Sequence, residues 1–303
     1  NVAERIANIN KEMDHLLSTD FFKTLDNSLI YLERTGADGK VRKGLIGMVD
    51  LEDYSYEKGS QSLIRATEGT VLERIPPRVR VRENASLELP HVMLLIDDEK
   101  KEIIEGLTDK VTSEDVVYDF DLIATAKACY ENLKKTMSEE EAKNSPARYA
   151  LVEVVNLHSD ALEFEPIHRV VFGVEPAKMI EEFEKYYDVS RTPGEGQKVE
   201  YVYEGKNETL YIKNPKSNLA VGSLQMFIDA YIKEHGGKVD YIHGDDVTKE
   251  LGSKPGNIGF LLPPMAKTEL FKTVILDGAL PRKTFSMGHS YDKRYYLEAR
   301  KIK

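Results

Sequence analysis

Hydrophobic residues recur along residues 1–122 in patterns that predict both helices and strands. The apolar positions of 3–17 recur every three or four residues, as on one face of an amphipathic helix. Other apolar residues gather in short runs rich in branched side chains, which predict strands, with an Ala-Asp-Gly turn joining the first two. These predicted strands are 28–34, 43–51, 92–96 and 116–122. A charged segment, 99–107, is expected to be a helix.

The second half alternates more regularly between the two periodicities. Strands are predicted at 150–157, 167–172, 199–203, 209–212, 239–242, 258–262 and 295–302. Helices are predicted at 123–134, 176–187, 219–235, 245–251 and 267–276. We therefore predict a mixed α/β (α+β) fold of two lobes, with mixed sheets flanked by helices. Residues 1–122 would form the N-terminal lobe and residues 123–303 the C-terminal lobe.

One junction indicates that the sequence is incomplete. The predicted strand 116–122 runs directly into the predicted helix 123–134, with no loop residue between Leu122 and Ile123. Because chain reversal normally needs a short loop, we expect a segment to be missing there. The chain also starts at Asn1 inside a helical pattern and without a methionine, so the natural N-terminus is expected to lie further upstream.

Composition limits the classes of function. The chain has 303 residues, of which 41% are hydrophobic and 31% charged, as in ordinary folded proteins. Its net charge of −10 disfavours binding to DNA or to an anionic membrane. The sequence shows no signal peptide and no apolar run long enough to cross a membrane. The only cysteine, Cys129, cannot form an internal disulfide and is expected to be a small buried residue, so we expect a cytoplasmic protein.

An arginine-rich stretch, residues 65–82, is the strongest candidate anion site in this acidic chain. Planar guanidinium groups bind phosphate or carboxylate through paired hydrogen bonds. If the part that follows Pro76-Pro77 is extended, its three arginines, two residues apart, share one face. The arginines of the stretch are Arg65, Arg74, Arg78, Arg80 and Arg82. Salt bridges with the surplus carboxylates, or a solvated face, are the structural alternatives.

Glu68 lies in the same stretch, beside Gly69 and between Thr67 and Thr70. A carboxylate flanked by hydroxyl groups can act as a general base or bind a metal ion. The structural alternative is that Thr70 and Glu73 cap a helix at this point.

Three further positions are candidates for acid/base chemistry or anion binding. His168 and Arg169 lie where the chain enters a predicted strand, and such a pair can protonate a leaving group and neutralise an oxyanion, unless the histidine is structural. His243 lies at the end of a predicted strand, where α/β proteins bind ligands, and precedes Asp245, the expected cap of the next helix. The polar loop 281–294 adds phosphate-binding candidates, namely Arg282, Lys283 and His289.

Common signatures of other enzyme classes are absent. The sequence has no P-loop, no dinucleotide-binding glycine motif, no G-x-S-x-G and no H-E-x-x-H.

Short motifs in a fixed order extend over nearly the whole chain and resemble a bacterial family. They are GLIGMVDLEDY (44–54), IRATEGTVLERIPPRVRVRENA (64–85), LPHVMLLIDD (89–98), ATAKACYE (124–131), LEFEPIHRVVFG (162–173), VDYIHGDD (239–246), NIGFLLPPM (257–265) and LPRKTFSMG (280–288). The family is that of domain of unknown function number 1015, some of whose members are labelled SpoOJ/ParB-like. In it, the helix that resembles ATAKACYE follows a glycine-rich stretch and an Asp-Gly-Asn/His-His motif. This sequence lacks both, at the Leu122–Ile123 junction.

The resemblance implies a ParB-like fold and a phosphate chemistry. ParB-like proteins include members that hydrolyse nucleotides or transfer phosphoryl groups, and the resemblance would place Arg65, Glu68, His168 and Arg169 around an anionic ligand. It also favours serine or phosphoserine as substrate, with Mg²⁺ a candidate cofactor bound through Glu68 or an absent Asp.

We therefore expect phosphoryl transfer or phosphate hydrolysis on a small metabolite or nucleotide, with His168, Glu68 and His243 as the catalytic candidates. The alternative is a non-catalytic ParB-like regulator or a metabolite or nucleotide sensor. The sequence gives no oligomeric state.

Overall fold

Three strands from the first half of the chain and one from the second form a four-stranded sheet. The computed structural model describes residues 1–89, 91–110, 130–287 and 298–302. The strand order is β1-β2-β7-β6, with β7 antiparallel to β2 and parallel to β6. These strands are β1 (Ile30–Thr35), β2 (Val41–Asp50), β6 (Val92–Ile96) and β7 (Tyr149–Asn156). The predicted hairpin of β1 and β2 is confirmed, with Gly39 at a φ of 81° in its turn.

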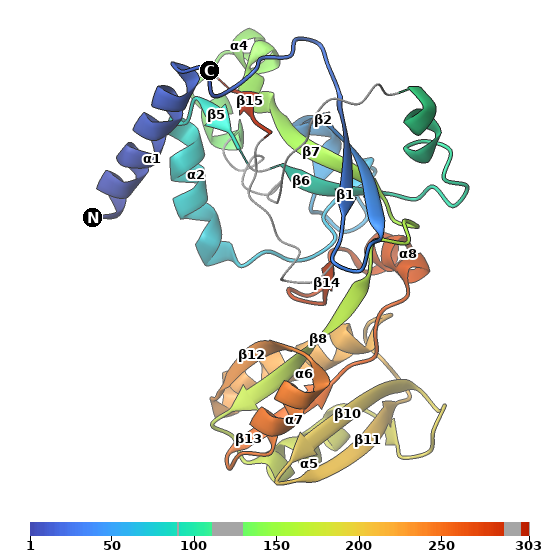
Figure 1. Cartoon of the computed structure of the whole chain (residues 1–303). Coiled ribbons are helices and arrows are strands. Elements are labelled where there is room, and N and C mark those ends of the chain that lie inside the picture. Colours follow the sequence, from blue (N-terminus) through green and yellow to red (C-terminus); the bar gives the residue numbers. More distant parts are fainter. Residues whose placement is uncertain (90, 111–129, 288–297, 303) are drawn as a thin grey trace.

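A second sheet has the order β12-β8-β13-β10-β11-β9, and β14 pairs with the start of β8. All of its pairings are antiparallel. The strands are β8 (Phe164–Phe172), β9 (Val189–Ser190), β10 (Gln197–Tyr203), β11 (Lys206–Ile212), β12 (Lys238–His243), β13 (Asn257–Leu261) and β14 (Phe285–Met287). Figure 1 shows β8 running from the side of the first sheet into the second, so β8 joins the two parts.

Helices flank the sheets. Those of the second part are α5 (Pro176–Tyr186), α6 (Ala220–His235), α7 (Asp245–Gly252) and α8 (Lys267–Asp277). Those of the first part are α1 (Val2–Leu17), α2 (Ile75–Asn84) and α4 (Glu139–Asn144). The apolar residues of α5 and α6 pack with those of β8, β10 and β13 in one core, which also contains Leu95 of β6 and Val155 of β7. The predicted mixed α/β fold is thus confirmed.

Short elements complete the chain. They are the 3₁₀ turns η1 (Leu51–Asp53), η2 (Leu72–Arg74), η3 (Glu105–Lys110) and η4 (Pro146–Arg148), and the strand pairs β3 (Tyr54–Ser55) with β4 (Ile64–Arg65) and β5 (Leu87–Glu88) with β15 (Arg300–Lys301). Among the described residues, no helix is long and apolar enough to cross a membrane.

The division into lobes stays a prediction, and strand pairing favours another boundary than residue 122. β7 lies beyond that residue, yet it pairs with β2 and β6 of the first sheet. β15, close to the end of the chain, returns to pair with β5. A division after Asn156 would leave the first sheet intact.

One predicted element is wrong, and one segment considered as extended is helical. The segment 99–107 is not a helix, because the carboxylate of Asp98 accepts the N–H of Ile103 at 2.8 Å and Lys101 turns the chain at a φ of 55°, so that only η3 follows. The arginine-rich part after residue 74 is the helix α2 and not an extended segment, since prolines occupy its first turn, where a missing N–H costs nothing.

Several predicted features lie partly or wholly outside the described residues. Strand 116–122, the Leu122–Ile123 junction, Cys129 and His289 fall there entirely. Of the predicted helix 123–134, residues 130–134 are described and are helical. Of the predicted last strand, only residues 298–302 are described, and β15 lies within them.

Candidate anion site at the junction of the two sheets

At the centre of the candidate site, the segment around Glu68 pairs with the backbone of Leu280, which is far away in sequence. Leu280 donates its N–H to the carbonyl of Thr67 at 2.9 Å, and its own carbonyl accepts the N–H of Gly69 at 2.7 Å. This pairing places Glu68 beside the loop that enters β14. Because β14 pairs with the start of β8, the predicted Glu68, Arg169 and Arg282 come from three segments to one place.

Glu68 is held by three consecutive backbone N–H groups. Its Oε2 accepts from Lys283 at 3.3 Å, and its Oε1 accepts from Thr284 at 2.9 Å and from Phe285 at 3.2 Å. Burial raises the pKa of Glu68, although these N–H groups oppose the shift. In this arrangement Glu68 fixes the loop. A role as general base stays a prediction.

Arg169 is a fully buried cation on β8. Its Nε donates to Gln225 at 3.2 Å, and its other nitrogens donate to the carbonyl oxygens of Ile167 and of Arg282, the latter at 3.2 Å. No carboxylate of the described chain lies at ion-pair distance from it, although the charges of Glu68 and Asp229 act on it. Burial lowers the pKa of Arg169 to about 10. A buried cation without a counterion is costly, so this position favours an anionic ligand.

Tyr241 connects this buried arginine to an exposed one. The guanidinium of Arg169 lies 5.0 Å and that of Arg282 5.7 Å from the centre of the Tyr241 ring. The Nε of Arg282 also donates to the Tyr241 hydroxyl at 2.8 Å. Tyr241 therefore sets the position of the exposed Arg282 side chain.

The pairing of β12 with β8 places His243 on the face of the sheet that carries Arg169 and Tyr241. Tyr241 is paired with Arg169 and His243 with Ile167 across β12 and β8, and residues two apart on a strand share a face. The Nδ1 of His243 lies 3.7 Å from a carboxylate oxygen of Glu165, and the imidazole is 54% exposed. The predicted acid/base residue His243 thus lies on the same face of the sheet as Tyr241 and Arg169 and is accessible to solvent.

His168 has both ring nitrogens engaged. Its Nδ1 accepts the N–H of Leu262 at 3.1 Å, and its Nε2 lies 2.9 Å from Asp245. This pattern places the proton on Nε2, which donates to Asp245. Asp245 is the first residue of α7, after Gly244, and is not the cap that the sequence suggested. His168 thus links β8 to α7 and to the residue that follows β13. An acid/base role for His168 stays a prediction.

We expect the pKa of the His168 imidazole to lie below its ordinary 6.5, with the proton of the neutral ring on Nε2. Burial lowers the pKa of His168 below its ordinary 6.5, although Asp245 opposes the shift. Because the unfolded chain takes up this proton first, the histidine makes folding less favourable as pH falls below 6.5. Nitrogen NMR shifts of the imidazole test the protonation state, and a titration midpoint at or above 6.5 would contradict it.

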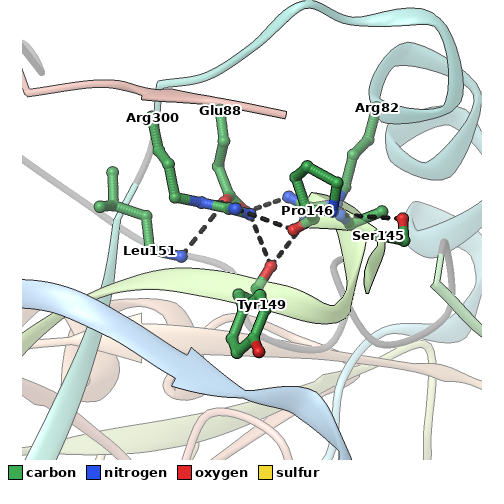
Figure 2. A network of polar contacts seen from close by, with 8 residues as sticks. Arg82, Glu88, Ser145, Pro146, Tyr149, Leu151 and Arg300 are labelled. Carbon is green, nitrogen blue, oxygen red and sulfur yellow. Dashed lines mark hydrogen bonds and ion pairs between the residues drawn. The ribbon is translucent and has the colours of Figure 1, made fainter. Parts of the chain in front are cut away.

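The remaining predicted arginines do not gather at this site. In the helix α2 successive residues are about 100° apart, so Arg80 points away from Arg78 and Arg82. Arg82 is buried and pairs with Glu88 (Figure 2). Arg74 and Arg80 are exposed. Arg65 donates to the carbonyl of Ser62 at 3.3 Å.

The alternative of a helix cap at Thr70 and Glu73 is not seen. The turn η2 starts after Val71, with no side-chain hydrogen bond to its first N–H groups.

The predicted Mg²⁺ ligand does not fit the contacts of Glu68. Both of its carboxylate oxygens accept backbone N–H groups, whereas Mg²⁺ binds carboxylate oxygens directly. Within the described ranges, no group of three or more His, Cys, Asp or Glu side chains could hold a metal ion. We therefore assign no metal-dependent step to Glu68 or to the other described side chains.

Sequence reasoning missed Tyr241 and Gln225. Tyr241 lies in the motif VDYIHGDD but carries no charge that would single it out. Gln225 is next to Leu224 on the buried face of α6, where it accepts from Arg169 and donates to Asp229 at 2.9 Å. A polar residue within the apolar stripe of the predicted helix 219–235 was the available signal for Gln225.

A pocket of about 190 Å³ borders the site. Thr284, Leu262 and the first residues of α6 are part of its lining. The N–H of Thr284 binds Glu68 and that of Leu262 binds His168, so the pocket adjoins both predicted residues.

The fold resembles that of several solved proteins. A variant of a free serine kinase in complex with ADP matches with a TM-score of 0.53 and 13% identity, over 87% of this chain and 93% of that chain. Another variant of a free serine kinase, in complex with AMP, matches with a TM-score of 0.52 and 13% identity, over 85% and 92%. C-terminally truncated SbnI from Staphylococcus aureus matches with a TM-score of 0.50 and 11% identity, over 84% and 86%.

No curated protein matches the sequence. The family described as "Protein of unknown function (DUF1015)" matches residues 1–123 and 122–231, two pieces that meet at the Leu122–Ile123 junction. Because these matches cover most of the chain, the protein belongs to that family.

Proposed function

We propose that the protein binds an adenine nucleotide at the junction of the two sheets and transfers a phosphoryl group to the hydroxyl of a small metabolite. The observation that carries the proposal is the buried charge of Arg169, which no carboxylate of the described chain pairs with at ion-pair distance. Phosphoryl transfer depends mainly on positioning and on neutralising the phosphate charge. Arg169, Arg282 and Lys283 supply that charge from neighbouring positions.

Serine is the first candidate substrate. The structures that share this fold include free serine kinases in complex with AMP or ADP. The pocket of about 190 Å³ beside Thr284 is smaller than the roughly 300–1,000 Å³ typical of drug-sized ligands, and so suits a small metabolite. His243, the accessible histidine on the face of Arg169, is our candidate for moving the hydroxyl proton.

Nucleotide titration by calorimetry tests the binding step. We expect ADP or ATP to bind the wild-type protein and the Arg282→Ala variant to bind about 10-fold more weakly, the loss of one charge-assisted hydrogen bond. Arg80→Ala is the matched control, because Arg80 is also exposed but lies on α2. Equal losses in both variants, or no binding to the wild type, would overturn the proposal.

Phosphorus NMR with serine then separates transfer from binding alone. A phosphoserine resonance that depends on nucleotide supports a kinase, and adding Mg²⁺ shows whether the nucleotide brings its own metal. Binding without a new resonance would favour the alternative of a nucleotide sensor. A ParB-like relationship stays a prediction, and the net charge of −10 disfavours its DNA-binding form.

A further inference from the structure

The backbone N–H groups that bind Glu68 have the arrangement of an anion site. The N–H groups of Lys283, Thr284 and Phe285 converge on one carboxylate. Lys283 has a φ of 58°, in the left-handed region. Successive N–H groups at such a turn form a concave nest, which binds phosphate and other anions. Here the anion in the nest belongs to the protein itself.

Basic residues lie close to this nest. Arg282 and Lys283 are exposed, and the buried guanidinium of Arg169 is hydrogen-bonded to the carbonyl of Arg282 at 3.2 Å. The Glu68 carboxylate acts on the charge of Arg169 without reaching ion-pair distance. The charges of Arg169 and Lys283 thus act on this single carboxylate, and Arg282 is the residue just before the nest. A phosphate group carries more charge and more acceptor oxygens than a carboxylate and would match these donors better.

We propose that residues 282–285 bind a phosphate group, and that the carboxylate of Glu68 occupies this phosphate site in the present structure and must leave when phosphate binds. The identity of the ligand rests on the proposed function. Displacement exchanges one set of N–H···O hydrogen bonds for another, so its cost is moderate. Glu68 acts as a built-in competitor that keeps weakly binding anions out of the site.

Calorimetric titration of inorganic phosphate and pyrophosphate tests this competition. Removal of the competitor in Glu68→Ala is expected to tighten binding of both probes by about 10-fold or more. Glu141→Ala is the matched control, since the Glu141 carboxylate also accepts a backbone N–H, from Ser138 at 2.8 Å, with no arginine among its contacts. We expect no gain in that control. Unchanged affinity in a folded Glu68→Ala variant would overturn the inference.

A second measurement serves if Glu68→Ala does not fold. In the wild-type protein, titration with phosphate should shift the amide NMR resonances of Lys283, Thr284 and Phe285. Saturation with pyrophosphate that leaves these three resonances in place would overturn the inference.

The outcomes separate this inference from the proposed function. A gain in phosphate affinity without phosphoserine formation would support the site and reject the kinase. Phosphoserine formation by a wild-type protein whose Glu68→Ala variant gains no phosphate affinity would support the kinase and reject the competitor role of Glu68.

Discussion

Replacing Glu88 by alanine is expected to lower the free energy of unfolding by about 3–5 kcal/mol, the cost of breaking a buried ion pair by removing one partner. Glu88 lies between Arg82 and Arg300, and all three side chains are at least 90% buried (Figure 2). Its Oε2 accepts from Arg300 at 2.8 Å and from the N–H of Leu151 at 3.1 Å. The variant would leave two buried arginines without this carboxylate.

The effect should be large because Glu88 connects segments that are distant in sequence. Arg300 of β15 also donates to the carbonyl oxygens of Pro146 and Tyr149, and Arg82 of α2 donates to Tyr149 as well. Glu88 therefore joins the end of the chain and α2 to the first sheet. A loss of this size is a substantial part of the roughly 5–15 kcal/mol by which proteins are stable.

Urea unfolding followed by circular dichroism measures the change. Glu181→Ala is the control, because Glu181 is an exposed glutamate of α5, and its change should stay within about 0.5 kcal/mol. Similar urea midpoints for Glu88→Ala and Glu181→Ala would contradict this prediction. They would show that solvent stabilises the charges of the two arginines as well as Glu88 does.

Local patterns predicted most of the second part of the fold. The predicted helix 219–235 corresponds to α6, because its apolar stripe and its final glycines are local signals. The predicted helix 99–107 failed because one side chain, Asp98, captures the N–H of Ile103 and turns the chain. Helical periodicity carries no information on such a contact.

The candidate site could be predicted only in part, because its geometry depends on long-range pairing. Arg169, Arg282 and Glu68 were candidates from their residue types, but their meeting depends on the pairing of Thr67 and Gly69 with Leu280. Arg78, Arg80 and Arg82 would share one face only if the segment after Pro76-Pro77 were extended. Prolines at the start of α2 favour a helix instead, which separates them.

Replacing Glu153 by glutamine is expected to lower the free energy of unfolding by about 3–5 kcal/mol, since it removes the charge of a carboxylate that is 1% exposed. Arg42 donates to both oxygens of Glu153, at 3.1 and 3.2 Å, and the Nε2 of His91 lies 3.1 Å away. Gly44 makes room for this side chain, because a Cβ there would lie 2.9 Å from the Cγ of Glu153. Gly44→Ala should therefore destabilise the protein in the same direction.

The pH dependence identifies the charge of Glu153 as the cause. Burial alone would raise the pKa of Glu153, but His91, Arg42 and Arg34 outweigh burial and hold the pKa below its ordinary 4.5. A carboxylate with a lowered folded pKa stabilises the protein above its unfolded pKa and loses that contribution as pH falls through the folded value. The difference in unfolding free energy between wild type and Glu153→Gln should thus be full at pH 7 and shrink below pH 4.5. A difference that stays constant across that range would mean that packing, and not charge, accounts for the loss.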